Sequence, residues 1–419
     1  MHLPLRRALS AAARASTAFR RALSAATSAP APVRRALSTA APPPWPWAMI
    51  RQAPAVRSPS LRASLMHADA PRDSYLLVPD HLVGRRPGPD PGSDIRGLLC
   101  GTVYATSGDG LLIVYMDFQA PSPIFSKFAA GVTPPMDDLN GFDINDPDFT
   151  RFVCNPLSGE LFRLPDIDGT KKTMLLTRSA AAGHAPPDSY VVAMLAEDHN
   201  GGGGFTMRRF LSRIGKWEKL VGLPSPLPFP RRMDIYPEGV AFAGRIWWAD
   251  LTWGVISADP FSDWPEHNFV ELPRGSVWLP SSDVVQVQGM HRRIGVSEGR
   301  LRYVEVSQKD PFVLSSFPLD DDGCSWTLEH QVAIGPLWEV KGGGPKDTPR
   351  IAVIDPVNSS VILVIVDEHL LAVDMDMGKV LDCSLADESE GPAYAITSVL
   401  KPCVLPPWLA SSKLPVADL

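Results

Sequence analysis

Cysteine is scarce in this chain, and the few cysteines are widely separated. The 419 residues include five of them, without a Cys-X-X-Cys pair: Cys100, Cys154, Cys324, Cys383 and Cys403. An odd, dispersed set predicts buried or free thiols in a reducing compartment, not a disulfide framework or a thiolate metal site. Cys154 lies at the end of an apolar run, so a core thiol is favoured over a nucleophile.

Long hydrophobic runs are also missing. The apolar segments have the length of a β-strand, as at 361–366, whereas a membrane-spanning helix needs roughly 20 apolar residues. We therefore expect no transmembrane segment. No uncharged apolar run follows the first arginines, which argues against a secretory signal peptide.

Acidic residues are absent from the first 68 positions, which contain ten arginines. Without those arginines the chain has 30 basic residues against 46 acidic ones, a net charge of −16. The body of the protein is therefore acidic. We expect no nucleic-acid partner, because phosphate binding needs clustered positive charge.

Residues 1–40 have the composition of an organelle transit peptide, being rich in Arg, Ala and Ser. On a helix, Arg7, Arg14 and Arg21 share one face, opposite an apolar face. The pentapeptide Arg-Arg-Ala-Leu-Ser occurs at 6–10, 20–24 and 34–38, and the last copy resembles a mitochondrial processing site. The arginine density favours the mitochondrion; the chloroplast and a low-complexity tail without an address are the alternatives. Residues 41–73 are predicted to be a Pro/Ser-rich linker.

The patterns of common catalytic and cofactor sites are not found. The glycine runs at 201–204 and 342–344 lack the Lys-Ser/Thr of a phosphate loop, and there is no H-E-X-X-H or G-X-S-X-G motif. The acidic loop at 143–148 lacks the glycine and the glutamate of a calcium loop. Asp198-His199 lies at the tip of a glycine-rich turn, a mobile place for catalysis. We predict no cofactor, no metal and no catalytic residue.

The sequence does contain many short apolar runs separated by turn residues, together with 43 prolines. Strand–turn–strand units begin near positions 97, 149, 190, 239, 293 and 350. Repeats of roughly 40–50 residues built from short strands are typical of a β-propeller. We therefore predict an all-β protein, a β-propeller of about six blades over 74–405, with few helices and a C-terminal tail at 406–419. Seven blades or a pair of β-sandwiches are the alternatives.

An apolar run followed by Asn-Pro or Asp-Pro recurs in these units, at Asn155, Asp259 and Asp355. The segment 152–159 with Leu164-Pro165 resembles plant F-box-associated, kelch-like propellers. The segments 239–260 and 296–304 resemble a plant family, domain of unknown function 1618, and the resemblance extends over about 74–405. It implies a β-propeller fold, but no activity and no site residues. The chain departs from F-box proteins because its N-terminus resembles a transit peptide and not an F-box.

Tryptophans are concentrated in one region, where Trp247, Trp248, Trp253, Trp264 and Trp278 lie within about thirty residues. Exposed tryptophans are favoured in binding hot spots, so the first four form our candidate interaction surface, with core packing as the alternative. We predict a scaffold that binds a protein or peptide partner. The alternatives are a propeller hydrolase or lyase with acidic residues at the central channel, and a ubiquitin-ligase-type substrate adaptor that lacks its F-box. The sequence does not indicate the oligomeric state.

Overall fold

The structure is a computed structural model of the chain. The residues that it describes are 46–51, 56–79, 81, 95–107, 111–121, 149–167, 173–179, 186–198, 204–228, 231–233, 238–278, 289–338, 345–385 and 400–415. The chain divides into two compact units, 1–38 and 39–419, and every described residue belongs to the second. The predicted transit peptide at 1–40 lies outside the described residues.

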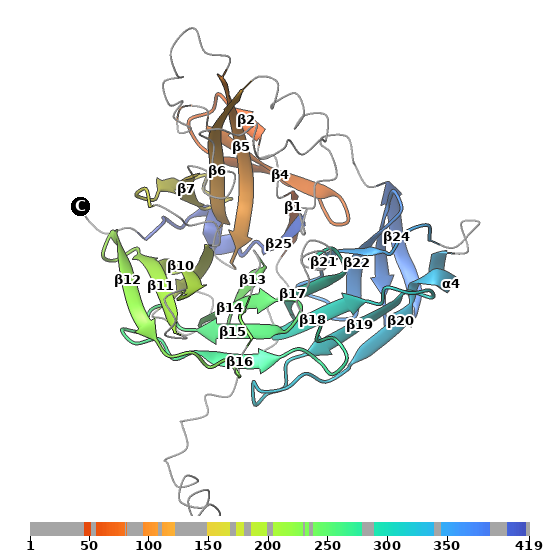
Figure 1. The fold of residues 1–419 in the computed structure, drawn as a ribbon. Helices are drawn as coiled ribbons and strands as arrows, with labels where there is room; N and C mark the ends of the chain where they lie inside the picture. The colour runs from red at the N-terminus through yellow and green to blue at the C-terminus, as the bar shows by residue number, and fades with distance from the viewer. Residues whose placement is uncertain are drawn as a thin grey trace, which may run out of the picture. The chain divides into compact units, whose positions relative to one another are not determined.

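The described part of the chain is built almost entirely of β-strands, as predicted (Figure 1). Five sheets have four antiparallel strands each, in the order of the sequence. Their strands are β5 (Ile95–Thr106), β6 (Leu111–Pro121), β7 (Phe149–Cys154) and β8 (Leu161–Arg163); β9 (Met174–Arg178), β10 (Ser189–Glu197), β11 (Phe205–Leu211) and β12 (Lys216–Leu223); β13 (Gly239–Phe242), β14 (Arg245–Asp250), β15 (Gly254–Ala258) and β16 (Asn268–Glu271); β17 (Arg292–Ser297), β18 (Arg300–Val306), β19 (Val313–Pro318) and β20 (His330–Ala333); and β21 (Arg350–Ile354), β22 (Val361–Val366), β23 (His369–Asp374) and β24 (Lys379–Leu385). These are the blades of a β-propeller arrangement.

A further sheet has a different composition. Its five strands are β1 (Trp47–Arg51), β2 (Val56–Ser58), β3 (Ser64–Met66), β4 (Asp73–Pro79) and β25 (Leu400–Val404). The pairs β1–β4 and β2–β4 are parallel, whereas β1–β25 and β3–β4 are antiparallel. The prediction of six blades is therefore corrected to five four-stranded blades, because this mixed sheet does not repeat their pattern. The predicted linker at 41–73 contains β1, β2 and β3, so part of it is folded.

The first strands of neighbouring blades contact one another. Contacts join β5 to β9, β9 to β13, β13 to β17 and β17 to β21, and β25 of the mixed sheet contacts both β21 and β5. We call β5, β9, β13, β17, β21 and β25 the inner strands. The mixed sheet thus links the last blade to the first, and it does so by pairing the beginning of the folded domain with its end.

Apolar side chains fill the spaces between blades. One core cluster joins Val304 and Leu314 of one blade to Ile362, Val364 and Val373 of the next. A single four-stranded sheet cannot cover both of its faces, and stacked blades cover them for one another. This arrangement explains why β10, β14 and β22 are buried along nearly their whole length and do not alternate between buried and exposed residues.

Helices are few in the described residues, as the sequence predicted. They include α4 (Ile334–Trp338) and the short 3-10 helix η5 (Pro407–Ala410). η5 lies in the predicted C-terminal tail, yet Leu409 and Leu414 are buried, so this part of the tail belongs to the folded domain. Among the described residues, none of the helices has the length and apolarity to span a membrane.

Candidate functional site

The structure separates the four tryptophans of the predicted interaction surface. Trp247, Trp248 and Trp253 are buried, with at most 4% of their surface exposed, whereas Trp264 is 59% exposed. Trp253 packs on Phe269 with ring centroids 4.8 Å apart. The first three therefore pack in the core, the alternative that the sequence left open, and Trp264 remains accessible to a partner.

Trp264 lies on the loop 259–267 between β15 and β16, and arginine side chains hold the backbone of this loop. Arg209 Nη1 donates hydrogen bonds to the carbonyl oxygens of Pro260, at 2.9 Å, and Ser262. Arg245 Nη2 donates to the carbonyl oxygen of Glu266 at 2.7 Å. Both arginines come from blade strands, β11 and β14, so the loop is attached to two neighbouring blades.

Further contacts fix the two ends of this loop. Arg178 Nη2 contacts the Asp259 carboxylate at 2.9 Å, and Asp259 Oδ1 accepts a hydrogen bond from the Phe261 amide. At the other end, His267 Nδ1 lies 3.1 Å from the carbonyl oxygen of Pro224. Burial lowers the pKa of His267; its bond to Pro224 acts in the opposite direction, and Arg245 lowers the pKa further. The imidazole is therefore neutral at physiological pH.

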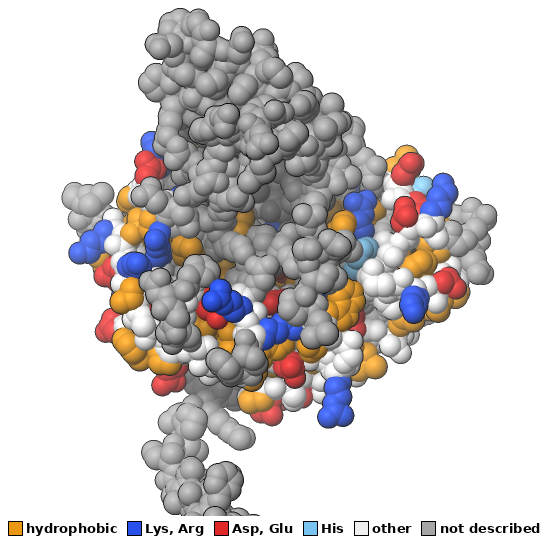
Figure 2. Space-filling view, in the orientation of Figure 1, with side chains coloured by type: hydrophobic (Ala, Val, Ile, Leu, Met, Phe, Trp, Pro, Cys, Tyr) orange, Lys and Arg blue, Asp and Glu red, His pale blue; other side chains and the backbone are white. Residues whose placement is uncertain are grey.

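Two exposed acidic side chains lie close to Trp264 in the sequence. Asp263 and Glu266 are exposed, and Arg209 Nη2 forms a long ion pair of 3.9 Å with Asp263 Oδ1. On the face drawn in Figure 2, acidic and basic side chains of the described residues are interspersed, without a broad patch of one sign. An exposed indole close to carboxylates is chemically suited to a lysine or arginine side chain.

A second candidate site is formed by charged side chains at three inner strands. Glu238 immediately precedes β13, Arg293 is on β17 and Lys401 is on β25, and all three side chains are at least 90% buried. The Glu238 carboxylate lies 3.9 Å from Arg293 Nε and 3.8 Å from Lys401 Nζ. Arg293 Nη1 also donates hydrogen bonds to the carbonyl oxygens of Ala352 and Leu400. We call Glu238, Arg293 and Lys401 the central charge cluster.

The electrostatics of the central charge cluster are dominated by burial. Burial lowers the pKa of Lys401; Glu238 opposes this change and Arg293 adds to it. Burial likewise lowers the pKa of Arg293, and Glu238 opposes the shift. A single carboxylate between two cations differs from the pair of carboxylates that a glycosidase uses. Sequence reasoning missed this cluster because its members are 55 and 108 positions apart.

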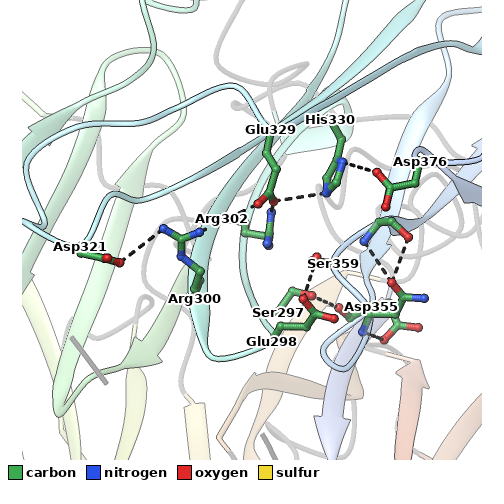
Figure 3. Close-up of polar contacts among 12 residues, drawn as sticks. Ser297, Glu298, Arg300, Arg302, Asp321, Glu329, His330, Asp355, Ser359 and Asp376 are labelled. Atoms are coloured by element: carbon green, nitrogen blue, oxygen red, sulfur yellow. Dashed lines mark hydrogen bonds and ion pairs between the residues drawn. The ribbon is translucent and has the colours of Figure 1, made fainter. Parts of the chain in front are cut away.

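Two carboxylates lie at the other ends of inner strands. Glu298 follows β17 and Asp355 follows β21, and the two are near each other in Figure 3. Burial raises the pKa of Asp355, the amides of Val357 and Asn358 lower it, and Glu298 raises it, with a net increase. Asp355 Oδ1 accepts hydrogen bonds from those two amides, at 2.8 and 3.0 Å. This carboxylate therefore has a structural task in the turn after β21.

A network of polar contacts joins the last two blades (Figure 3). His330 Nδ1 lies 2.8 Å from Asp376 Oδ1 of the next blade, and His330 Nε2 lies 3.3 Å from Glu329 Oε2. Glu329 also accepts a hydrogen bond from Arg302. Burial raises the pKa of Glu329, but the hydrogen bond and positive charge of Arg302 outweigh it, so the pKa lies below its ordinary value. The network fastens one blade to the next.

A cleft of about 430 Å³ lies where the two ends of the folded domain meet. It is lined by the turn between β7 and β8, by Leu61 and Arg62, by His81, and by residues 410–413. Arg62 Nη1 donates a hydrogen bond to the carbonyl oxygen of Ser158 at 3.4 Å. No sequence pattern indicated this cleft, because residues about 350 positions apart form it.

The remaining predicted sites are only partly described. The acidic loop 143–148, His199 and the glycine run at 342–344 lie outside the described residues. Cys154 is buried as predicted, and burial raises the pKa of its thiol, with a smaller contribution from Cys403. Cys324 differs, since it is exposed. Within the described ranges, no three His, Cys, Asp or Glu side chains are grouped as they would be around a metal ion.

The solved structures similar to this chain include two enzymes and a β-propeller domain, and all three similarities are low. An α-L-arabinofuranosidase from Fusarium graminearum is 12% identical, with 78% of this chain and 83% of that chain covered and a TM-score of 0.30. A periplasmic gluconolactonase from Pseudomonas aeruginosa is 14% identical, with 75% and 100% covered and a TM-score of 0.29. The Cps50 β-propeller domain from Myceliophteria thermophila is 9% identical, with 71% and 87% covered and a TM-score of 0.29.

Comparison with curated proteins gives no significant match. One family model does match part of the sequence. The matched segment begins at Trp248, within β14, and ends at His369, the first residue of β23. It therefore includes the loop of Trp264 and Arg293 of the central charge cluster, but not Glu238 or Lys401. Residues 248–369 match the family described as protein of unknown function (DUF1618).

Proposed function

We propose that the protein is an interaction scaffold and that the loop carrying Trp264 binds a basic segment of a partner protein. The observation that supports this most directly is an exposed tryptophan on a loop whose backbone is already fixed by Arg209 and Arg245. A loop held in one conformation loses little entropy on binding. Large exposed aromatic side chains in such positions are typical of binding hot spots.

The chemistry around Trp264 determines the class of partner. The indole face attracts a cation, and the carboxylates of Asp263 and Glu266 add Coulombic attraction. The excess of acidic residues over the whole chain, 46 against 40 basic ones, acts in the same direction at long range. The partner is therefore a peptide segment that presents lysine or arginine, and binding weakens as the salt concentration rises.

Binding of a short fluorescent peptide rich in arginine and lysine tests this proposal. The substitution Trp264→Ala should weaken binding by about 30-fold, which corresponds to the roughly 2 kcal/mol of a hot spot. Leu385→Ala is the matched control, because Leu385 is an equally apolar and exposed side chain on β24 of a different blade. Equal affinities for the wild type and Trp264→Ala would refute the role of this loop.

We also propose that residues 1–40 direct the protein to the mitochondrion, with the chloroplast as the alternative. The ten arginines and the absence of acids in the first 68 positions support this. N-terminal sequencing of the protein from isolated organelles is the test. A new N-terminus close to the third Arg-Arg-Ala-Leu-Ser copy is expected, and an intact Met1 in the organelle would contradict cleavage.

The alternative of a hydrolase or lyase is supported by one feature, the two carboxylates Glu298 and Asp355 that follow β17 and β21, because a pair of carboxyl groups can divide the roles of general acid and general base. Burial and Glu298 raise the pKa of Asp355, which is the direction that a general acid requires. Asp355→Asn distinguishes a structural role from a catalytic one. An asparagine can still accept the hydrogen bonds from Val357 and Asn358, but it cannot act as a general acid. A hydrolytic activity towards chromogenic glycosides or lactones that this variant abolishes would favour the enzyme. The adaptor alternative predicts co-purification with a ubiquitin-ligase scaffold protein.

A further inference from the structure

The central charge cluster contains polar atoms without hydrogen-bond partners. Glu238 Oε2, Arg293 Nε and Arg293 Nη2 are buried, and none of them has a partner among the described residues. The ion-pair distances of 3.8 and 3.9 Å are longer than hydrogen bonds. Most buried polar groups in proteins are hydrogen-bonded, so three such atoms in one cluster indicate a missing binding partner.

The charges of the cluster do not balance either. Arg293 and Lys401 contribute two positive charges and Glu238 contributes one negative charge, and no other ion pair of these residues occurs in the described part of the chain. A buried charge without a counter-ion costs several kcal/mol. A water molecule would satisfy hydrogen bonds but leave this excess of one positive charge. A bound anion would accept hydrogen bonds from the arginine and also neutralise the excess positive charge.

We propose that the central charge cluster binds an anion, a single carboxylate or phosphate group, between Arg293 and Lys401 of two inner strands. Arg293 Nη2 and Lys401 Nζ are the donors, and Glu238, the residue before β13, orients both cations. Arg293 also holds the backbone of Ala352 and Leu400, so an anion at this position connects the blades of β13, β17 and β21 with the mixed sheet. The ligand therefore stabilises the assembled ring.

Thermal denaturation of the full chain in different anions tests the proposal. Added phosphate or acetate, compared with chloride at the same ionic strength, should raise the Tm of the wild type by a few degrees in a saturable way, because a ligand that binds only the folded state stabilises it. The phosphate and acetate arms distinguish the two classes of anion. Calorimetric titration with the more effective anion should then give one site per chain.

Two substitutions change the excess charge in opposite directions. Lys401→Met removes the excess, so the rise of Tm with the anion should be lost. Glu238→Gln increases the excess from one charge to two, so this variant should be less stable in chloride and should bind the anion about tenfold more tightly, as expected for the loss of a nearby like charge. Lys219→Met, at an exposed position on β12, is the matched control and should respond as the wild type does.

Several results would overturn the inference. If the Tm of the wild type changes equally in chloride, phosphate and acetate, the cluster holds water and not one of the proposed anions. Equal responses of Lys401→Met, Lys219→Met and the wild type would show that the anions act on the surface of the protein. If Glu238→Gln fails to fold, the comparison of Lys401→Met with Lys219→Met still decides the question.

Discussion

Gly254 lies where no side chain can be accommodated. A Cβ atom on this residue would lie 2.4 Å from the ring of Phe269 and 2.6 Å from the carbonyl oxygen of Val270. That carbonyl belongs to the paired backbone of β16, so it cannot move without disturbing the blade. Phe269 is in turn packed on Trp253. The absence of a side chain at Gly254 thus allows β15 and β16, the third and fourth strands of this blade, to pack closely together.

We expect Gly254→Ala to destabilise the protein by about 1–3 kcal/mol, the usual cost of over-packing. Gly295→Ala is the comparison, and it should cost less, because its closest obstacles are Cδ1 of Ile354 at 2.9 Å, the end of a side chain, and Cβ of Ile354 at 3.3 Å, with no backbone atom as near as at Gly254. Urea denaturation of the three proteins measures the difference. A Gly254→Ala variant as stable as the wild type would mean that the two strands can separate at no cost.

His291 makes the stability of the fold depend on pH. Its Nδ1 lies 2.9 Å from the carbonyl oxygen of Pro349. Burial lowers the pKa of His291; the bond to Pro349 opposes this, and Arg350 and Arg292 lower the pKa further. The unfolded chain therefore takes up this proton more readily than the folded one.

Stability should accordingly be retained above the ordinary histidine pKa of about 6.5 and decrease as the pH falls below it towards the lower pKa of the folded state. In His291→Asn, whose amide can still donate to Pro349, the decrease in unfolding free energy between pH 7 and pH 5.5 should be smaller. Denaturation curves at several pH values measure it. If the unfolding free energy falls equally in His291→Asn and the wild type between pH 7 and pH 5.5, groups other than His291 cause the pH dependence.

The strands could be recognised from the sequence, but the burial of their individual side chains could not. Trp247 and Trp248 were both candidates for the interaction surface, and as neighbours in a strand they point to opposite faces of the sheet. Both are buried, because a blade between two others is covered on both faces. Period-two alternation identifies a strand but does not reveal what covers its second face. For the same reason, the exposure of Trp264 could be established only from the structure.

At the scale of elements, the recurring Asn/Asp-Pro step has a common structural role. Asn155, Asp259 and Asp355 each accept a hydrogen bond at Oδ1 from the amide two residues further on, which is the Asx turn that short polar side chains favour. Asn155 differs from the other two because its Nδ2 donates to the carbonyl oxygens of Leu409 and Ser412. This residue therefore connects a turn to the C-terminal segment.

Asn155→Asp should release the C-terminal segment while preserving the turn. The carboxylate can still accept from the amides of Leu157 and Ser158, but it would face two carbonyl oxygens without a proton to donate, at a cost of about 1–3 kcal/mol. Hydrogen exchange of residues 405–414 should become faster. Asp355→Asn is the matched control and should leave this exchange unchanged; equal exchange in both variants would contradict the proposed connection.

Strand pairing was predictable where neighbouring strands are joined by short turns. The Ala243-Gly244 and Glu298-Gly299 steps have positive φ angles, between 48° and 72°, and they connect β13 to β14 and β17 to β18 as expected for such hairpins. The strand pairing of the mixed sheet was not predictable. Its strands β2 and β3 have only three residues each. β25 pairs with β1 across about 350 residues, and no local sequence pattern indicates such a distant pairing.

At the scale of the whole molecule, the number of blades was wrong for an identifiable reason. The units that were expected to begin near 149 and 190 are β7, the third strand of the first blade, and β10, the second strand of the next. The apolar runs were recognised correctly, but long connections within blades were taken for boundaries between them. The mixed sheet went unnoticed because prolines at 42–46 and serines at 58–64 resemble a linker.

The closure of the ring by β1 gives the last prediction. Ala48, Met49 and Ile50 are fully buried, and β1 pairs with both β25 and β4. Deletion of residues 1–51 would expose an edge of β25 and remove the contact between the two ends of the domain, so cooperative unfolding should be lost or the Tm should fall sharply. Deletion of residues 1–38, which precede every described residue, should leave the Tm unchanged. Calorimetry of the two truncated proteins distinguishes a ring that needs β1 for closure from one that the five blades close by themselves, and equal Tm values would establish the latter.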